Sequence, residues 1–213
     1  MIPLKCESHP NNLPLVTILL MTGAVVTFGY QLQTPDALRG FVPLDFVHAL
    51  FHPGEQTFET LKLCCVSLFL HGGLFHLASN MWYLWIFGNA VEYKMHGVLF
   101  LVCYVVAGAV SMIVQALSDP YSSVPVVGAS GAIAGIMGMH LVLLPFARII
   151  VWVPPIFVLP VPAFIFLIAW FIMQYLGAGS RSEMYIAWWA HIGGFITGIL
   201  LALRLRRKKA LFK

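Results

Sequence analysis

The stretch GASGAIAGIMGMHLVLLP, residues 128–145, decides how this chain folds. It is apolar, but from Ser130 to the stop at Pro145 it can form a helix of only about 15 residues, or about 22 Å at 1.5 Å per residue. Because a bilayer core is about 30 Å thick, the amino end of this helix must lie below the membrane surface. The preceding loop then enters the membrane, where non-helical backbone is tolerated only beside protein or a water-filled cavity. We therefore expect a water-accessible pocket at Ser130.

The rest of the chain has the composition of a membrane protein. Hydrophobic residues make up 60% of the 213 residues and charged residues only 9%, which is outside the range of soluble domains. Six apolar stretches are candidate membrane spans: Leu13–Tyr30, His71–Val91, Val98–Leu117, Ser130–Leu144, Ile156–Leu176 and Met184–Leu203. The prediction is one domain over residues 1–213, an all-α bundle of six transmembrane helices with a short, sunken fourth helix.

The positions of Lys and Arg predict the orientation in the membrane. With both termini in the cytoplasm, nine lie inside, namely Lys5, Lys94, Arg148 and six in the basic tail at residues 204–213, and three lie outside. Cytoplasmic loops carry the excess of Lys and Arg, so we expect this orientation. The net charge of +4 then reflects membrane anchoring and does not indicate nucleic-acid binding. The second, fourth and sixth helices begin at the same outer level.

Two connections between the spans have features of their own. The first outer loop, residues 31–70, contains the apolar stretch FVPLDFVHALF at residues 41–51, which we expect to form short amphipathic helices along the interface. Four prolines lie around the start of the fifth predicted span and delay a regular helix there, because proline removes a helical hydrogen bond. These are Pro154, Pro155, Pro160 and Pro162.

Ser130 lies between Ala129 and Gly131 at the junction of a loop and a helix, with Gly128 two residues before it. Free N–H groups and the positive end of the helix dipole lie at such a junction, and both stabilise negative charge on a carbonyl oxygen. The position therefore suits a nucleophile. The alternative is a helix-capping serine followed by a GxxxG packing face at Gly131 and Gly135.

His191 is an ionisable residue about 12 Å along the predicted sixth helix, within an apolar run. A histidine at that depth requires a polar partner. Gly194 and Gly198 form a second GxxxG motif, which would bring the sixth helix into close contact with the fourth and Ser130 near His191. A neutral imidazole could then act as the general base. No acidic residue is placed near this depth, so we predict a catalytic dyad whose histidine is oriented by packing or a polar neighbour.

His76 and Asn80 are spaced i, i+4 at the start of the second predicted helix and so share one face at the outer level. Both can donate hydrogen bonds to a developing oxyanion, and the alternative is that they hold helices together. His71 and His76 do not match the spacing of a zinc motif, and the four cysteines show no CxxC pattern. The sequence therefore predicts no metal and no cofactor.

Four motifs occur in order along the chain: HGGLFHLASN (71–80), GNAVE (88–92), GASGAIAG (128–135) and AHIGGFITG (190–198). Together they resemble the rhomboid family of intramembrane serine proteases over the six-helix core. The resemblance implies Ser130 as the nucleophile and His191 as the general base. It also implies that His76 and Asn80 stabilise the oxyanion, with Gly128 shaping the loop.

The same resemblance implies what the protein acts on. Its partners would be the lipid bilayer and single-pass membrane proteins, whose transmembrane helix enters near the fifth helix and unwinds locally. Helix-destabilising residues and a small residue before the cut would favour cleavage. The alternative is a catalytically silent rhomboid-like protein that binds membrane-protein clients. A transporter or channel would place ionisable groups through the midplane, whereas these cluster near one end.

The sequence departs from the family pattern at two places. Many members carry Trp-Arg in the first outer loop, where this chain reads Leu61-Lys62, and an aromatic residue four positions after the serine, where it has Ala134. The second change removes a ring expected to stack on the histidine, so another group must orient His191. The absence of a presequence and the minimal six-helix core favour a prokaryotic cytoplasmic membrane.

Overall fold

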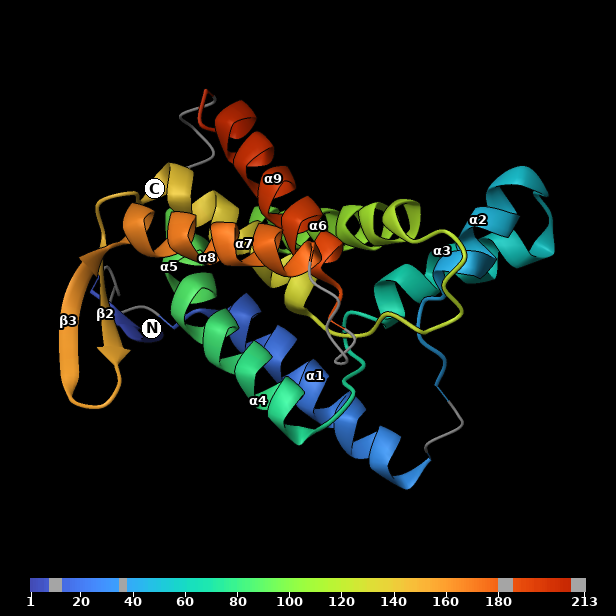
Figure 1. Cartoon of the computed structure of the whole chain (residues 1–213), viewed down its shortest axis with the longest axis horizontal. Coiled ribbons are helices and arrows are strands. Elements are labelled where there is room, and N and C mark those ends of the chain that lie inside the picture. The colour runs from blue at the N-terminus through green and yellow to red at the C-terminus, as the bar shows by residue number, and fades with distance from the viewer. Residues whose placement is uncertain (8–12, 35–37, 180–185, 208–213) are drawn as a thin grey trace.

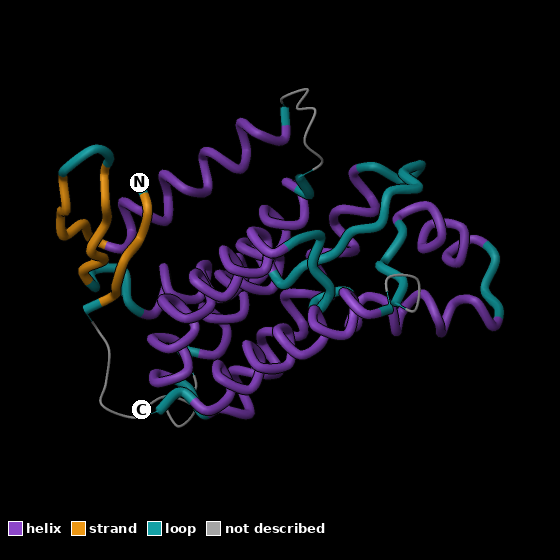
Figure 2. Tube along the Cα trace, turned by 90° about the horizontal axis from the view of Figure 1, so that it is seen from below, coloured by secondary structure: helices purple, strands orange, loops and turns teal. Residues whose placement is uncertain are grey.

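The computed structural model describes residues 1–7, 13–34, 38–179 and 186–207. Helices make up most of these residues and form one bundle (Figure 1). A small sheet lies at one end of the long axis, and two short helices, α2 (Pro43–Phe51) and α3 (Glu55–Val66), lie at the other. Figure 2 shows the same separation from below. The short helices predicted for the first outer loop are therefore present.

Three helices are long and apolar enough to cross a membrane, judged over the described residues by length and composition: α1 (Leu15–Gln33), α6 (Gly97–Ser118) and α9 (Trp188–Leu205). Two apolar helices are shorter, α7 (Ser130–Leu143) and α8 (Ala163–Ala178). The predicted short fourth helix is confirmed, because α7 has 14 residues and begins at Ser130. The predicted total of six spans stays a prediction.

The second predicted span is one helical run with a π-helical turn inside it. It consists of α4 (Leu74–Tyr83), the π segment η1 (Leu84–Gly88) and α5 (Asn89–Lys94). Near its end, the carboxylate of Glu92 accepts hydrogen bonds from the backbone N–H groups of Val16 and Thr17, at 2.9 and 2.7 Å, and from the Thr17 hydroxyl at 2.8 Å. These N–H groups lie in the first turn of α1 and have no partner within that helix. Glu92 therefore connects α1 to the second predicted span.

The all-α prediction is wrong in one region, where three strands form an antiparallel sheet. β1 (Ile2–Cys6) pairs with β2 (Arg148–Val153), and β2 pairs with the edge strand β3 (Phe157–Pro162). The predicted fifth helix was meant to begin at Ile156, yet α8 begins only after Pro162. The reason is the prolines, which cannot donate a helical hydrogen bond and are tolerated in an edge strand.

The sixth predicted span begins at Met184, which lies outside the described residues, and its observed helix α9 begins at Trp188. The centre of the bundle is the contact between α7 and α9. Every α7 residue from Gly131 to His140 is buried. A Cβ added to Gly194 would overlap the carbonyl oxygen of Gly131, and one added to Gly198 would overlap that of Gly135. The predicted close approach of these helices is confirmed.

Candidate active site

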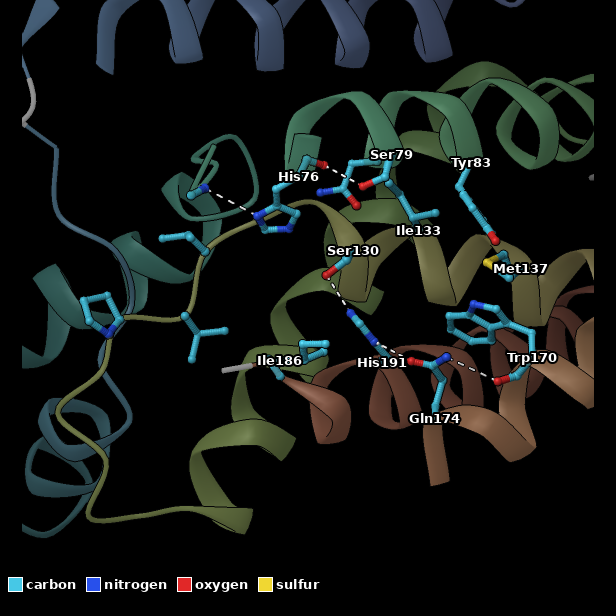
Figure 3. A pocket seen from close by; sticks show the side chains of 16 residues that line it. His76, Ser79, Tyr83, Ser130, Ile133, Met137, Trp170, Gln174, Ile186 and His191 are labelled. Carbon is cyan, nitrogen blue, oxygen red and sulfur yellow. Dashed lines mark hydrogen bonds between the residues drawn. The ribbon is translucent and has the colours of Figure 1, made fainter. Parts of the chain in front are cut away.

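Ser130 and His191 form a hydrogen-bonded pair at the start of α7 and α9. The Ser130 hydroxyl oxygen and Nε2 of His191 are hydrogen-bonded at 2.8 Å (Figure 3). Ser130 is the first residue of α7, and His191 lies in the first turn of α9. Because the glycines let the two helix backbones touch, a short serine side chain reaches the imidazole directly.

The loop before Ser130 is held by backbone hydrogen bonds to the first outer loop. The N–H of Val126 donates to the carbonyl of Phe41 at 2.7 Å, and the N–H of Gly128 donates to the carbonyl of Ser67 at 2.9 Å. The Ser67 hydroxyl in turn accepts the N–H of Phe41 at 2.7 Å. This network fixes the loop before Ser130 and pairs the backbone N–H groups of Val126 and Gly128.

Gly128 has a φ of +117°, a conformation that side chains other than glycine rarely adopt. A Cβ at this position would lie 2.8 Å from the ring of His76 and 3.5 Å from Nδ2 of Asn80. Gly128 therefore allows both α4 side chains to approach the backbone next to Ser130. All five sequence-predicted site residues lie together in the fold.

Asn80 is only 6% exposed, and its amide nitrogen Nδ2 is buried with no hydrogen-bond partner among the described residues. Leaving a buried donor unpaired is costly, so an unpaired donor this close to Gly128 is available for a substrate oxygen. His76 is oriented differently. Its Nδ1 accepts the N–H of Gly72 at 3.4 Å, which leaves Nε2 as the protonated nitrogen of a neutral ring.

A cavity of about 470 Å³ opens over Ser130. Residues of α4, α7, α8 and α9 line it, together with the loop before Ser130 (Figure 3). Its wall includes the polar groups of His76, Asn80 and Gln174 and the apolar side chains of Ile133 and Met137, and further lining residues are labelled in the figure. A pocket at Ser130, as the sequence predicted, is therefore present.

Gln174 is the site residue that sequence reasoning missed. It lies on α8, is 6% exposed, and its amide oxygen accepts a hydrogen bond from Nδ1 of His191 at 2.8 Å. The sequence did contain a signal for it, because Gln174 is the single amide side chain in the apolar helix α8. A polar residue in such a helix is normally functional.

Two tryptophan rings lie beside His191. The ring centroids of Trp170 and Trp188 are 6.1 and 6.3 Å from that of the imidazole, and Trp188 meets it edge-on at 86°. Ala134, where the resemblance leads one to expect a stacking ring, is fully buried in α7. The rings next to His191 therefore come from α8 and α9.

The donor set at the site does not suit a metal ion. Within the described ranges, no three His, Cys, Asp or Glu side chains are grouped closely enough to hold one. His71 and His76 lie close together, with ring centroids 5.3 Å apart, but the third neighbour is an amide, Asn80. The site is a hydroxyl, an imidazole and hydrogen-bond donors around a cavity.

Comparison with known proteins shows what this chain is similar to. The Rhomboid domain family model matches residues 58–208. The chain is 31% identical over 204 residues to "Rhomboid protein 1, mitochondrial" of Saccharomyces cerevisiae, covering 91% of this chain and 53% of that protein. It is 44% identical over 69 residues to "Rhomboid protease GluP" of Bacillus subtilis, covering 32% of this chain and 13% of that protein.

A third relative is "Presenilin-associated rhomboid-like protein, mitochondrial" of Homo sapiens, 28% identical over 141 residues, with 63% of this chain and 35% of that protein covered. The chain thus spans about half the length of the yeast relative and less of the other two. The family match extends over most of the chain and includes Ser130, His191 and the α4 residues. This chain belongs to the rhomboid family.

Proposed function

We propose that this protein is an intramembrane serine endopeptidase that cleaves transmembrane segments through the Ser130–His191 dyad. The observation that carries the proposal is the 2.8 Å hydrogen bond from the Ser130 hydroxyl to Nε2 of His191, beside a cavity in a membrane-type bundle. A nucleophile and a base within hydrogen-bond reach are the signature of nucleophilic catalysis.

In the proposed reaction, Oγ of Ser130 attacks the scissile carbonyl while Nε2 of His191 takes its proton. The tetrahedral intermediate collapses to an acyl-enzyme as His191 returns that proton to the leaving amine. Water then attacks the ester, with His191 again as base, and the second product leaves with Ser130 restored. Both steps use the same imidazole nitrogen, so its orientation must be kept throughout.

The negative charge on the carbonyl oxygen would be stabilised by three donors. They are Nδ2 of Asn80, Nε2–H of His76 and the backbone N–H of Ser130 at the start of α7. The unpaired state of Asn80 Nδ2 and its position near Gly128 support this assignment. Donors already aimed at the oxyanion do not have to reorient during the reaction.

Transmembrane segments of single-pass proteins are the proposed substrates, as the family resemblance implies. The cavity supports this because it contains both polar groups for the chemistry and apolar walls, Ile133 and Met137 among them, for a hydrophobic side chain. α8 lines one side of the cavity and presents apolar residues such as Ile168 and Ile172 at its surface, which suits a helix arriving from the lipid.

The compartment is also a proposal. Membership in the rhomboid family and the apolar helices make this a membrane protein. The relative from Bacillus subtilis supports the predicted prokaryotic cytoplasmic membrane, whereas the mitochondrial relatives from yeast and human do not fit it. The distribution of Lys and Arg still predicts that both termini lie in the cytoplasm.

The test is labelling of the purified protein in detergent with a fluorescent fluorophosphonate. We expect labelling of the wild type and none of Ser130→Ala or His191→Ala, since removing either member of a catalytic pair removes the activated hydroxyl. Cleavage of a reconstituted single-pass substrate should be lost in the same variants. A folded wild type that is neither labelled nor able to cleave would favour the silent client-binding protein instead.

A further inference from the structure

We propose that Gln174 is the positioning residue of His191, whose amide oxygen holds the imidazole in the one orientation and tautomer that turn Nε2 toward Ser130. The proposal rests on the proposed serine protease function. It assigns to a neutral amide on α8 the task for which the sequence offered neither a carboxylate nor a stacking ring on α7.

The orientation of the Gln174 amide follows from its second contact. Its Nε2 donates to the backbone carbonyl oxygen of Trp170 at 3.3 Å. A carbonyl oxygen can only accept, so the NH₂ end of the amide must face Trp170, and the opposite end, Oε1, must face His191. Exchanging the two ends would place two oxygens against each other.

The tautomer of His191 follows in turn. Oε1 of Gln174 lies 2.8 Å from Nδ1 and can only accept, so Nδ1 must carry the proton. In a neutral imidazole the other nitrogen is then unprotonated. That nitrogen is Nε2, which lies 2.8 Å from Oγ of Ser130 and is able to take its proton. Figure 3 shows the chain of contacts from Ser130 through His191 and Gln174 to Trp170.

Ring packing alone cannot determine which edge of the His191 ring faces Ser130. Trp170 and Trp188 lie 6.1 and 6.3 Å from the imidazole and restrict the plane of the ring. Turning the ring by half a rotation would occupy nearly the same volume, because the end torsion of histidine is roughly two-fold. Such a turn would present a carbon to Gln174 and remove the hydrogen bond. The amide therefore selects which edge of the ring faces Ser130.

A neutral amide suits this location. Gln174 is 6% exposed in an apolar helix, where an ionised carboxylate would be costly. When His191 takes the serine proton, Nδ1–H becomes a charged donor, and a hydrogen bond to a charged group is stronger than one between neutral groups. The contact with Gln174 thus strengthens in the transition state, which is where a rate effect arises.

The test compares Gln174→Met with Gln174→Glu, two side chains of the same length as glutamine. Met has no oxygen to accept Nδ1–H, and we expect kcat for a reconstituted substrate to fall about 10- to 100-fold with KM within about threefold. Glu keeps an acceptor oxygen in either protonation state, so its kcat should be at least about fivefold above that of Met.

A direct readout is the ¹⁵N NMR spectrum of histidine-labelled protein, with the His191 signals identified by their loss in His191→Ala. The wild type should show Nδ1 protonated and Nε2 unprotonated, and Gln174→Met should show a mixture. Met173→Leu is the matched control on the same helix, since Met173 is 53% exposed, and should leave kcat, thermal unfolding and the His191 signals unchanged.

Two kinetic results would overturn the positioning role: wild-type kcat in Gln174→Met, or equal losses in Gln174→Met and Gln174→Glu. A wild-type protein with Nε2 protonated would also overturn it, and this result does not depend on activity. Full cleavage by Ser130→Ala would instead overturn the proposed protease function. The two failures are therefore distinguishable.

Discussion

The helices α7 and α8 both pack against α9, but they do so in different ways. α7 has ten of its 14 residues buried and meets α9 backbone to backbone at glycines. α8 has four of its 16 residues buried and meets α9 through rings, with Phe171 stacked on Phe195 at a centroid distance of 4.9 Å. Side chains can re-pack after a substitution, whereas a carbonyl group in a helix cannot move aside.

His191 lies between these two kinds of contact. On the α7 side, the helix backbones set its distance to Ser130. On the α8 side, an amide and an aromatic ring set its orientation. The rigid contact with α7 therefore determines whether Ser130 and His191 can pair. The adaptable contact with α8 determines how well the imidazole is oriented toward Ser130.

Among these contacts, the largest effect is expected on the α4 side of α7, where Asn80, the proposed oxyanion donor, lies. Asn80→Ala removes a preorganised donor, so kcat should fall about 100- to 1,000-fold with little change in KM. Asn89→Ala is the matched control, because Asn89 is equally buried, at 6%, but lines a separate cavity with Glu92. Michaelis–Menten kinetics in proteoliposomes measure kcat and KM for both variants. Equal kcat values for Asn80→Ala and the wild type would remove Asn80 from the mechanism.

The α7–α9 contact is broken by Gly194→Ala, whose Cβ overlaps the carbonyl oxygen of Gly131. The helices must separate, and a misplacement of about 1 Å can cost about 100-fold in rate. We also expect unfolding to become easier by about 1–3 kcal/mol, as is usual for overpacking.

Gly29→Ala makes the same chemical change in α1 at a position where the new Cβ meets nothing within 4 Å. It should preserve activity and raise stability by up to about 1 kcal/mol, because alanine favours a helix over glycine. The stability and activity of Gly194→Ala and Gly29→Ala are measured by thermal unfolding in detergent and by cleavage rates. Identical behaviour of the two variants would show that the close glycine contact is not what holds Ser130 near His191.

The smallest effect is expected for the α8–α9 contact. Phe171→Leu removes the ring that stacks on Phe195 but leaves an apolar side chain, so the loss of stability should be below about 1.5 kcal/mol. The cleavage rate should stay within about threefold of the wild type, since Gln174 and Trp170 keep their contacts with His191. A loss as large as that of Gly194→Ala would show that α8 is as rigidly packed as α7.

Most of the site residues could be predicted from the sequence because the patterns that indicate them are local. The short apolar run that begins at Ser130 predicted a short helix with Ser130 at its start, and the GxxxG at Gly194 and Gly198 indicated which helix would meet it. Gln174 was missed because a single amide in an apolar helix does not indicate which way it faces. Only the rotation of α8 within the bundle directs it to His191.

The sequence by itself determined the apolar helices, the short length of α7 and the close contact of α7 with α9, because hydropathy and glycine spacing act over a few turns of one helix. Only the tertiary structure decided the sheet, since β1 pairs with β2, about 150 residues further along the chain. It also decided the second partner of His191, Gln174 on α8. Strand pairing and side-chain contacts between helices depend on residues distant in sequence, and no local pattern records them.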